Sequence, residues 1–385
     1  MRLLLWLVVG SLVVASATAQ QTVQFGGPFV VGELKKGAVD EASGIAASRL
    51  HEGLLWIHND SGDGAFVYGL SVKGAVQCTV HLVGAANADW EDIAVGPGPD
   101  KGTSYIYAGD IGDNAAQRTN ITIYRFAEPA DASGNINVTA DALIFTYPDG
   151  ARDAEALMVD PATQDIYIVT KREKRSRIYV AKAPHNTGTP RALTFLGELK
   201  NPLIVGGDIS PKGDEILLKD YVYAYYWQRK ANETIIQALK RDPTKVAYMP
   251  EPQGEAICFS AKGDGYYTIS ERPDTMWATN LYFYGRARNT AEADQLKDAK
   301  RPSMSLTPSN DTEGIYDLRY VVPEVANIRI TVHNAAMMKI EDVELNASEG
   351  GVQEREIDMI DKPAGTYVVV LRAGSAYAAQ VLEHK

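Results

Sequence analysis

The sequence predicts an all-β protein, a five-bladed β-propeller followed by a small Ig-like β-sandwich. Three observations predict this fold class: a short motif that recurs about every fifty residues, strand-like segments after each copy, and a change of composition after Arg288. Four strands per unit and a period near fifty residues are typical of propeller blades. The alternative at this point is a sandwich of unrelated strands.

The recurring motif consists of a polar, often acidic residue, a small residue and then an apolar pair entering a strand. Taking one position as equivalent in all copies, the spacings along the chain are 48, 64, 52 and 48 residues. The copies are Glu41–Ala46, Asp89–Ala94, Asp153–Met158, Gly206–Ser210 and Gly254–Cys258, and the equivalent residues are Ser43, Glu91, Glu155, Gly207 and Glu255.

Each copy is followed by a second and a third strand-like segment, and four of the five by a fourth. The fifth unit has no fourth strand, whereas Phe29–Leu34 near the N-terminus resembles Thr194–Leu199 of the third unit. We therefore expect the N-terminal strand to complete the last blade and close the ring, which removes exposed strand edges. A sixth blade is the alternative, because Asp311–Tyr316 resembles the motif.

The domain boundaries follow from composition. Residues 1–19 have the charged start, apolar run and Ala17-Thr18-Ala19 end of a secretory signal peptide, the alternative being a retained membrane anchor. We expect the propeller to span 20–290, a linker 291–301 and the sandwich 302–385, whose alternating strands favour a half-exposed sandwich. The expected location is secreted, with no membrane span and attachment through the C-terminal domain as one option.

Charge and residue counts exclude some partners. The formal net charge is −11, with 38 Lys and Arg against 49 Asp and Glu, so we expect no nucleic-acid partner. Cys78 and Cys258 fall on distant strands of the predicted ring, so we expect two buried free thiols. Six N-x-S/T sequons indicate a glycoprotein; they lie at Asn59, Asn120, Asn137, Asn232, Asn310 and Asn346.

The inner strands of a propeller converge on its axis, so Glu91, Glu155 and Glu255 are expected to lie close together there. Carboxylates so placed repel one another unless they are protonated or a cation intervenes, and oxygen ligands suit Ca²⁺. Ser43 would complete the metal site, with either the Gly207 carbonyl or Asp208 from the fourth unit. The alternative is that these acids accept hydrogen bonds from backbone amides of neighbouring blades.

Polar residues at the ends of the second strands form a predicted rim around this site. Basic residues there would hold phosphate oxygens, and Asp60 or Asp110 would act as general base. Salt bridges between blades are the alternative. The predicted ligand-binding residues of the rim are Asn59, Asn114, Lys171, Arg172, Lys219 and Arg272.

Three family resemblances follow from these motifs. Glu41–Ala46, His58–Asp63, Asp89–Ala94 and Gly109–Asn114 look like a poorly characterised class of exported propellers grouped with phytase-like calcium propellers. The ring resembles calcium-activated apyrases in architecture, which implies a central Ca²⁺ held by one residue of each inner strand. Ser305–Asn310, Leu318–Glu324, Ile328–Asn334 and Pro363–Val368 resemble the Ig-like sorting domains of type IX secretion cargo.

Three functions are compatible with this reading. The first is a calcium-dependent hydrolase of phosphoric esters or anhydrides, acting on a small molecule at the propeller face. The second is a non-catalytic extracellular binding or matrix protein. The third is a lactonase-like calcium propeller, which would use the same carboxylates without a basic rim. The sequence contains no G-x-S-x-G elbow, P-loop, H-E-x-x-H or dinucleotide fingerprint.

Overall fold

The computed structural model describes residues 23–271, 279–287, 302–309, 312–322, 326–348, 351–374 and 376–385. Within these residues the chain is almost entirely β-strand, with one short helix, α1 (Ile235–Leu239). The predicted signal peptide, the predicted linker 291–301, Arg272 and Asn310 lie outside the described residues. No helix in the described part of the chain is long and apolar enough to cross a membrane.

Strands β1 to β22 form five sheets of four or five strands. The first contains β2 (Ala42–Ala47), β3 (Leu54–Asn59), β4 (Phe66–Ser71), β5 (Val76–Leu82) and β9 (Gly134–Val138). The second contains β6 (Trp90–Pro97), β7 (Ser104–Asp110), β8 (Ile121–Ala127), β10 (Asp141–Thr146) and β14 (Arg191–Ala192). The third contains β11 (Ala154–Val159), β12 (Ile166–Thr170), β13 (Arg177–Ala181) and β15 (Thr194–Glu198). The fourth contains β16 (Gly206–Ile209), β17 (Glu215–Lys219), β18 (Ala224–Gln228) and β19 (Thr244–Val246), and the fifth β20 (Gly254–Phe259), β21 (Gly265–Ser270), β22 (Thr279–Ala287) and β1 (Gln24–Leu34).

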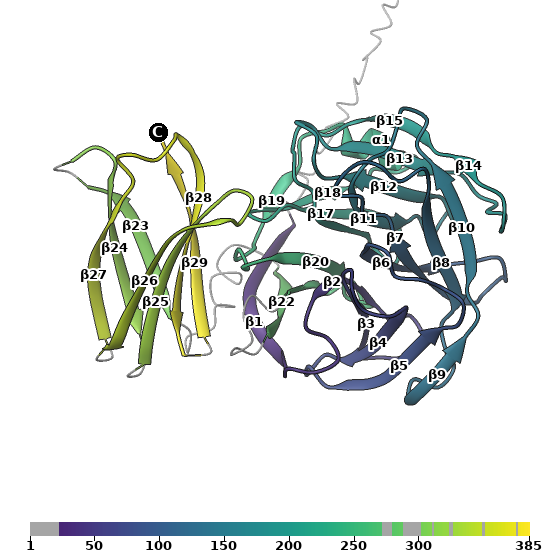
Figure 1. Ribbon diagram of the computed structural model, residues 1–385, viewed down its shortest axis with the longest axis horizontal. Helices are drawn as coiled ribbons and strands as arrows, with labels where there is room; N and C mark the ends of the chain where they lie inside the picture. Colours follow the sequence, from purple (N-terminus) through teal and green to yellow (C-terminus); the bar gives the residue numbers. More distant parts are fainter. Residues whose placement is uncertain are drawn as a thin grey trace, which may run out of the picture.

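These sheets are arranged in a closed ring (Figure 1). The innermost strands β2, β6, β11, β16 and β20 contact one another in that order, and β20 contacts β2 again. Each sheet packs against its two neighbours through apolar side chains, so strands such as β3 are buried on both faces. A ring of antiparallel sheets with their first strands around the centre is a β-propeller.

The ring is closed by the N-terminal strand. β1 pairs antiparallel with β22, with Phe29 opposite Phe283 and Leu34 opposite Thr279. The expectation that the first strand completes the last sheet is therefore confirmed. Two further strands connect neighbouring sheets: β9 pairs parallel with β5, and β14 pairs parallel with β10. These pairings cover the outer edges of the first and second sheets.

The remaining strands form a β-sandwich of two sheets. One contains β23 (Ser303–Pro308), β24 (Ile315–Val322) and β27 (Gly351–Asp358). The other contains β26 (Lys339–Ser348), β25 (Ala326–Asn334), β28 (Gly365–Ala373) and β29 (Ala376–His384). Their common core includes Leu318, Ile330, Ile357 and Val369. The motif-like segment near Glu313 leads into β24 of this sandwich, so it contributes no sheet to the ring.

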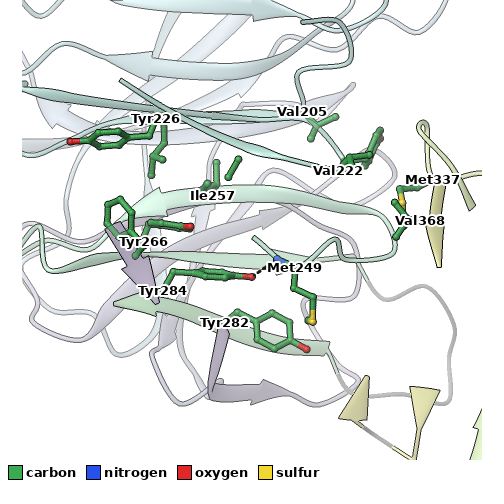
Figure 2. Close-up of a cluster of buried hydrophobic side chains, with 14 of the residues drawn as sticks. Val205, Val222, Tyr226, Met249, Ile257, Tyr266, Tyr282, Tyr284, Met337 and Val368 are labelled. Carbon is green, nitrogen blue, oxygen red and sulfur yellow. Dashed lines mark hydrogen bonds between the residues drawn. The ribbon is translucent and has the colours of Figure 1, made fainter. Parts of the chain in front are cut away.

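The sandwich packs against the propeller through β28 and its neighbours, and β28 is buried on both faces. Tyr367, Val369 and Leu371 point into the sandwich core, whereas Val368 and Val370 belong to a cluster shared with the propeller. Figure 2 shows Met337 and Val368 beside Val222 of the fourth sheet's loop. The expectation of a half-exposed strand is therefore wrong for β28, because the propeller covers its outer face, whereas Arg329 and Asp342 on β25 and β26 form an exposed ion pair.

Polar contacts add to this interface. The hydroxyl of Tyr223 donates a hydrogen bond to Glu383 over 2.8 Å. The rings of Tyr282 and Tyr377 meet edge to face, with centroids 5.9 Å apart.

Cys78 lies on β5 and Cys258 on β20, and both are buried and free. The prediction of two free thiols is confirmed.

Candidate metal centre

A β-bulge places the central side chains in four of the five sheets. Between β2 and β3 the register skips Ser43, and the same shift skips Glu91, Glu155 and Glu255 between the first two strands of their sheets. A bulge inserts one unpaired residue and changes the direction of its side chain, and bulges often lie beside functional sites. The repeated motif therefore positions these four residues by one common device.

The four bulged residues are buried and meet at the centre of the ring. Exposed fractions are 1% for Ser43, 3% for Glu91, 2% for Glu155 and 5% for Glu255. The Ser43 hydroxyl donates to the Glu91 carbonyl oxygen over 2.6 Å and lies 3.4 Å from carboxylate oxygens of both Glu91 and Glu255. The structure thus brings together side chains that are up to 212 positions apart in sequence.

The fourth sheet has the buried, apolar Val205 at the equivalent position, and the Val205 amide donates to the Lys219 carbonyl over 2.9 Å. Gly206 pairs with Lys219 and Gly207 with Leu218 without a register shift. A Cβ atom on Gly207 would lie 2.5 Å from the Leu218 side chain and 3.4 Å from the Met158 sulfur, which are core atoms between sheets. Gly207 therefore lies two positions beyond Val205, the residue equivalent to the bulged residues of the other sheets.

Two side chains from outside the motif enter the centre. The Lys171 ammonium, from the loop after β12, donates to Glu155 Oε1 and lies 3.6 Å from Glu255 Oε1. The Tyr221 hydroxyl, from the loop after β17, donates to the same Glu255 oxygen over 2.6 Å. Lys171 also lies 5.3 Å above the Tyr221 ring, a favourable cation–π contact. Lys171 was expected on the rim, but the structure places its charge among the central carboxylates.

The electrostatics follow from burial and crowding. Burial, together with the neighbouring carboxylates, raises the pKa of Glu91 and that of Glu155 well above their ordinary value. Burial also raises the pKa of Asp60 to about 6 and that of Glu271 to about 8. Burial alone would lower the pKa of Lys171. The negative charges of Glu155 and Glu255 outweigh the effect of burial, so the pKa of Lys171 is raised. The centre thus holds more carboxyl groups than the ammonium of Lys171 can neutralise.

Two groups of carboxylates share Glu91. Glu91, Asp153 and Glu155 offer oxygens within 4.8 Å of one another and are all buried. Asp60, Asp89 and Glu91 form a second such group, in which Asp60 and Asp89 are partly exposed. The Gly112 backbone lies against Glu91 and Asp89. A Cβ atom at this position would lie 2.3 Å from Glu91 Oε1 and 2.6 Å from Asp89 Oδ2. In the buried group, Glu155 Oε2 has no hydrogen-bond partner among the described residues.

The predicted rim residues of the second and third sheets form one ionic network. Arg118 donates to Asp110 Oδ1 over 2.7 Å, and Arg172 donates to Asp153 and to Asn114. Lys219 is not on the rim: it is fully buried, donates to the Gly254 carbonyl and lies 4.9 Å from the centre of the Tyr248 ring. Burial lowers the pKa of Lys219 to about 8.

Asp208 faces a neighbouring sheet. Its Oδ2 accepts a hydrogen bond from the Phe259 amide of the fifth sheet over 2.9 Å. Asp92 forms the same kind of link, accepting from the Leu157 amide of the third sheet over 2.8 Å. Carboxylates of Asp92 and Asp208 thus connect neighbouring sheets by accepting from backbone amides. Among the described residues, the three central glutamates have no such contact. Neither Asp208 nor Gly207 lies with the central carboxylate oxygens.

The sequons differ in accessibility. The Asn59 side chain is 7% exposed, and its nitrogen donates to Ala38 O and Asp63 Oδ2, each over 2.7 Å. A glycan would replace one of the two hydrogens on that nitrogen and so would break one of these bonds. Asn120, Asn137 and Asn232 are exposed.

Sequence reasoning did not select Asp89, Asp153 and Tyr221 as site residues. A signal existed for the first two, since both occupy the first position of the recurring motif, two residues before Glu91 and Glu155. Tyr221 has no counterpart in the repeat, and only the folded loop shows its role.

The fold and the site together define a class: a β-propeller with a buried carboxylate centre. No family model and no curated protein sequence matches the chain. Among the solved structures to which the chain is similar is the Cps50 (Swd1) β-propeller domain of Myceliophteria thermophila, with 10% identity and a TM-score of 0.35 over 64% of this chain and 84% of that one. The Dos1 propeller is 10% identical, with a TM-score of 0.31, over 62% of this chain and 66% of that one.

The chain is also similar to PorZ, a bacterial surface component of the type IX secretion system of Porphyromonas gingivalis. The identity is 13% and the TM-score 0.30, over 88% of this chain. The chain spans about half of PorZ, 51% of its length. These similarities are low, and the propeller assignment rests on the closed ring of sheets.

Proposed function

We propose that the chain is a secreted, five-bladed, calcium-binding β-propeller, each of the five sheets being one blade. The observation that carries the proposal is the group of Glu91, Asp153 and Glu155, in which the buried Glu155 Oε2 has no hydrogen-bond partner among the described residues. Burying an unpaired carboxylate oxygen is costly, and a cation beside it removes that cost. The proposal includes export by residues 1–19 and an Ig-like sandwich at 302–385 that attaches the protein outside the cell.

The donor set fits calcium. All three residues offer carboxylate oxygens, which hard cations prefer, and no histidine or cysteine belongs to the group. Ser43 Oγ lies 3.4 Å from Glu91 Oε2 and can add a neutral oxygen. Calcium accepts irregular geometry and several carboxylates, whereas magnesium requires a near-ideal octahedron. Extracellular calcium concentrations also suit a site of moderate affinity.

Calcium should therefore stabilise the full-length protein. At a hundredfold excess over the dissociation constant the expected gain is about 2.7 kcal/mol, seen as a rise in the melting temperature. Glu155→Gln removes the charge of the unpartnered oxygen and should weaken calcium binding at least tenfold in calorimetry. The matched control is Glu356→Gln, which removes one exposed carboxylate from β27. Equal calcium affinity in wild type and Glu155→Gln would contradict the proposal.

A second candidate function is calcium-dependent hydrolysis of a phosphoric ester or anhydride. The observation that favours it is the partly exposed group of Asp60, Asp89 and Glu91, which connects the buried centre to solvent. A bound cation there would polarise a phosphoryl oxygen, and Asp60 would accept the proton of the attacking water. Against this function, the basic groups expected to hold phosphate, Lys171, Arg172 and Lys219, are engaged with Glu155, Asp153 and Gly254.

The hydrolase function predicts calcium-dependent phosphate release from nucleotides, phytate or an aryl phosphate. Asp60→Asn should then lower kcat at least a hundredfold while calcium still binds. Asp361→Asn, at an exposed position of the sandwich, is the control for the loss of one charge. Absence of calcium-dependent turnover on all three substrates would favour a non-catalytic binding protein that uses the same cation site.

A further inference from the structure

The centre of the ring is asymmetric, and the asymmetry is built into the fourth sheet. Four sheets place a polar bulged residue at the centre, whereas the fourth, between the sheets of Glu155 and Glu255, has the apolar, buried Val205 at the equivalent position. β16 of this sheet contacts β11 on one side and β20 on the other. A gap in the ring of polar side chains therefore lies between Glu155 and Glu255.

The Lys171 ammonium lies in this gap. Its ion pairs are with the two glutamates on either side of the fourth sheet, Glu155 and Glu255. Lys171 is 8% exposed, and Tyr221 holds Glu255 from the fourth sheet's own loop. A lysine from the third sheet thus occupies the place where the fourth sheet lacks a polar ring residue.

The two oxygens of Glu155 consequently have different surroundings. Oε1 accepts the hydrogen bond from Lys171, whereas Oε2 has no partner among the residues that the structure describes. Glu91 and Asp153 each offer an oxygen within 4.8 Å of the Glu155 ligand atom. Lys171 therefore neutralises one side of the ring. On the other side Arg172 pairs with Asp153, and among the described residues no cation pairs with Glu91 or with Glu155 Oε2.

We propose that Lys171 is a fixed cation of the carboxylate ring, and that it restricts the ring to one divalent cation, held on the side of Glu91, Asp153 and Glu155. The part of this inference that concerns divalent cations rests on the proposed function. Lys171 acts here as a positioning residue: its one positive charge is shared between Glu155 and Glu255. Without it, the gap between Glu155 and Glu255 becomes a second cation position.

Lys171→Met in the full-length protein tests this, with calcium chloride alone as the probe. Calorimetry should give one calcium per wild-type chain and two per variant chain, or at least a tenfold tighter first site. Lys171→Arg keeps the positive charge and should still bind one calcium ion per chain. Lys182→Met is the matched control, because Lys182 is paired with Asp165 by a 2.7 Å ion pair and is mostly exposed. An unchanged stoichiometry and affinity in a folded Lys171→Met protein overturns the proposal.

Two further measurements separate this inference from the proposed function. If Lys171→Met does not fold without calcium, refolding with calcium should restore it, and failure to do so counts against the fixed-cation role. If the wild type binds no calcium, the proposed function fails, but the charge role remains testable without metal. Melting temperatures of Lys171→Met, Glu155→Gln and the double variant should then be non-additive, with the double variant more stable than Lys171→Met. Additive effects overturn the inference alone.

Discussion

Replacing Val368 by aspartate should detach the C-terminal sandwich from the propeller. Val368 is fully buried in the cluster that it shares with Val222 and Met337 (Figure 2). A carboxylate at this position loses the burial of the valine and must be desolvated without a partner, which costs several kcal/mol. Undocking relieves that cost, because the outer face of β28 then lies in water while Val369 and Leu371 keep the sandwich core intact.

Small-angle scattering measures this effect directly. The radius of gyration of Val368→Asp should increase, and thermal unfolding should separate into two transitions, one for each domain. Val352→Asp is the matched control, since Val352 lies on β27 of the same sandwich and is 53% exposed. A compact Val368→Asp protein with one cooperative transition would show that the apolar cluster does not hold the domains together.

The β28 strand also shows what the sequence could have predicted about the interface. Tyr367–Leu371 is a continuous apolar run, which is typical of a strand buried on both faces. The alternation in other segments, such as Ile328–Val332 and Glu354–Ile357, produced the expectation of a half-exposed sandwich. The uninterrupted run was thus a readable sign of a partner, although it could not identify the propeller as that partner.

The centre of the ring was predictable in part. The motif aligned Ser43, Glu91, Glu155 and Glu255, and these are the residues that the bulges place together. Gly207 was aligned with them because the motif compares residue types, whereas the register of the strands decides which side chain reaches the axis. A bulge inserts one residue without any change in composition, so a sequence pattern alone does not reveal that Val205, and not Gly207, is equivalent to the bulged residues.

The contributions of Lys171 and Tyr221 had a different origin. Both residues lie just beyond the ends of second strands, β12 and β17, where the direction of a side chain depends on the loop. Lys171 was assigned to a phosphate-binding rim because its charge suits phosphate. Its burial beside Glu155 and Glu255 reverses that interpretation, since an ammonium held by two carboxylates is not available to an anion.

Asp208→Asn should remove a pH-dependent contribution to the stability of the folded protein. Burial raises the pKa of Asp208 to about 6 in the folded protein, compared with 3.8 for an unperturbed aspartate. Because the folded state binds the proton more tightly, stability rises as pH falls through 6 and levels off below 3.8. The difference of about two pKa units corresponds to about 3 kcal/mol. Above pH 6 the ionised carboxylate is destabilising, although the Phe259 amide compensates part of the cost.

Asparagine has the same size and keeps an oxygen that accepts from Phe259, but it does not titrate. Urea unfolding between pH 7.5 and pH 4 should therefore show wild type gaining up to about 3 kcal/mol relative to Asp208→Asn as the solution is acidified. Comparing the two proteins at each pH cancels the titration of every other group. Asp317→Asn, at an exposed position on β24, corrects for the loss of one charge and should show no such change. A constant difference between wild type and Asp208→Asn would mean that Asp208 stays ionised throughout this range and that the blade contact to Phe259 is strong enough to hold the charge.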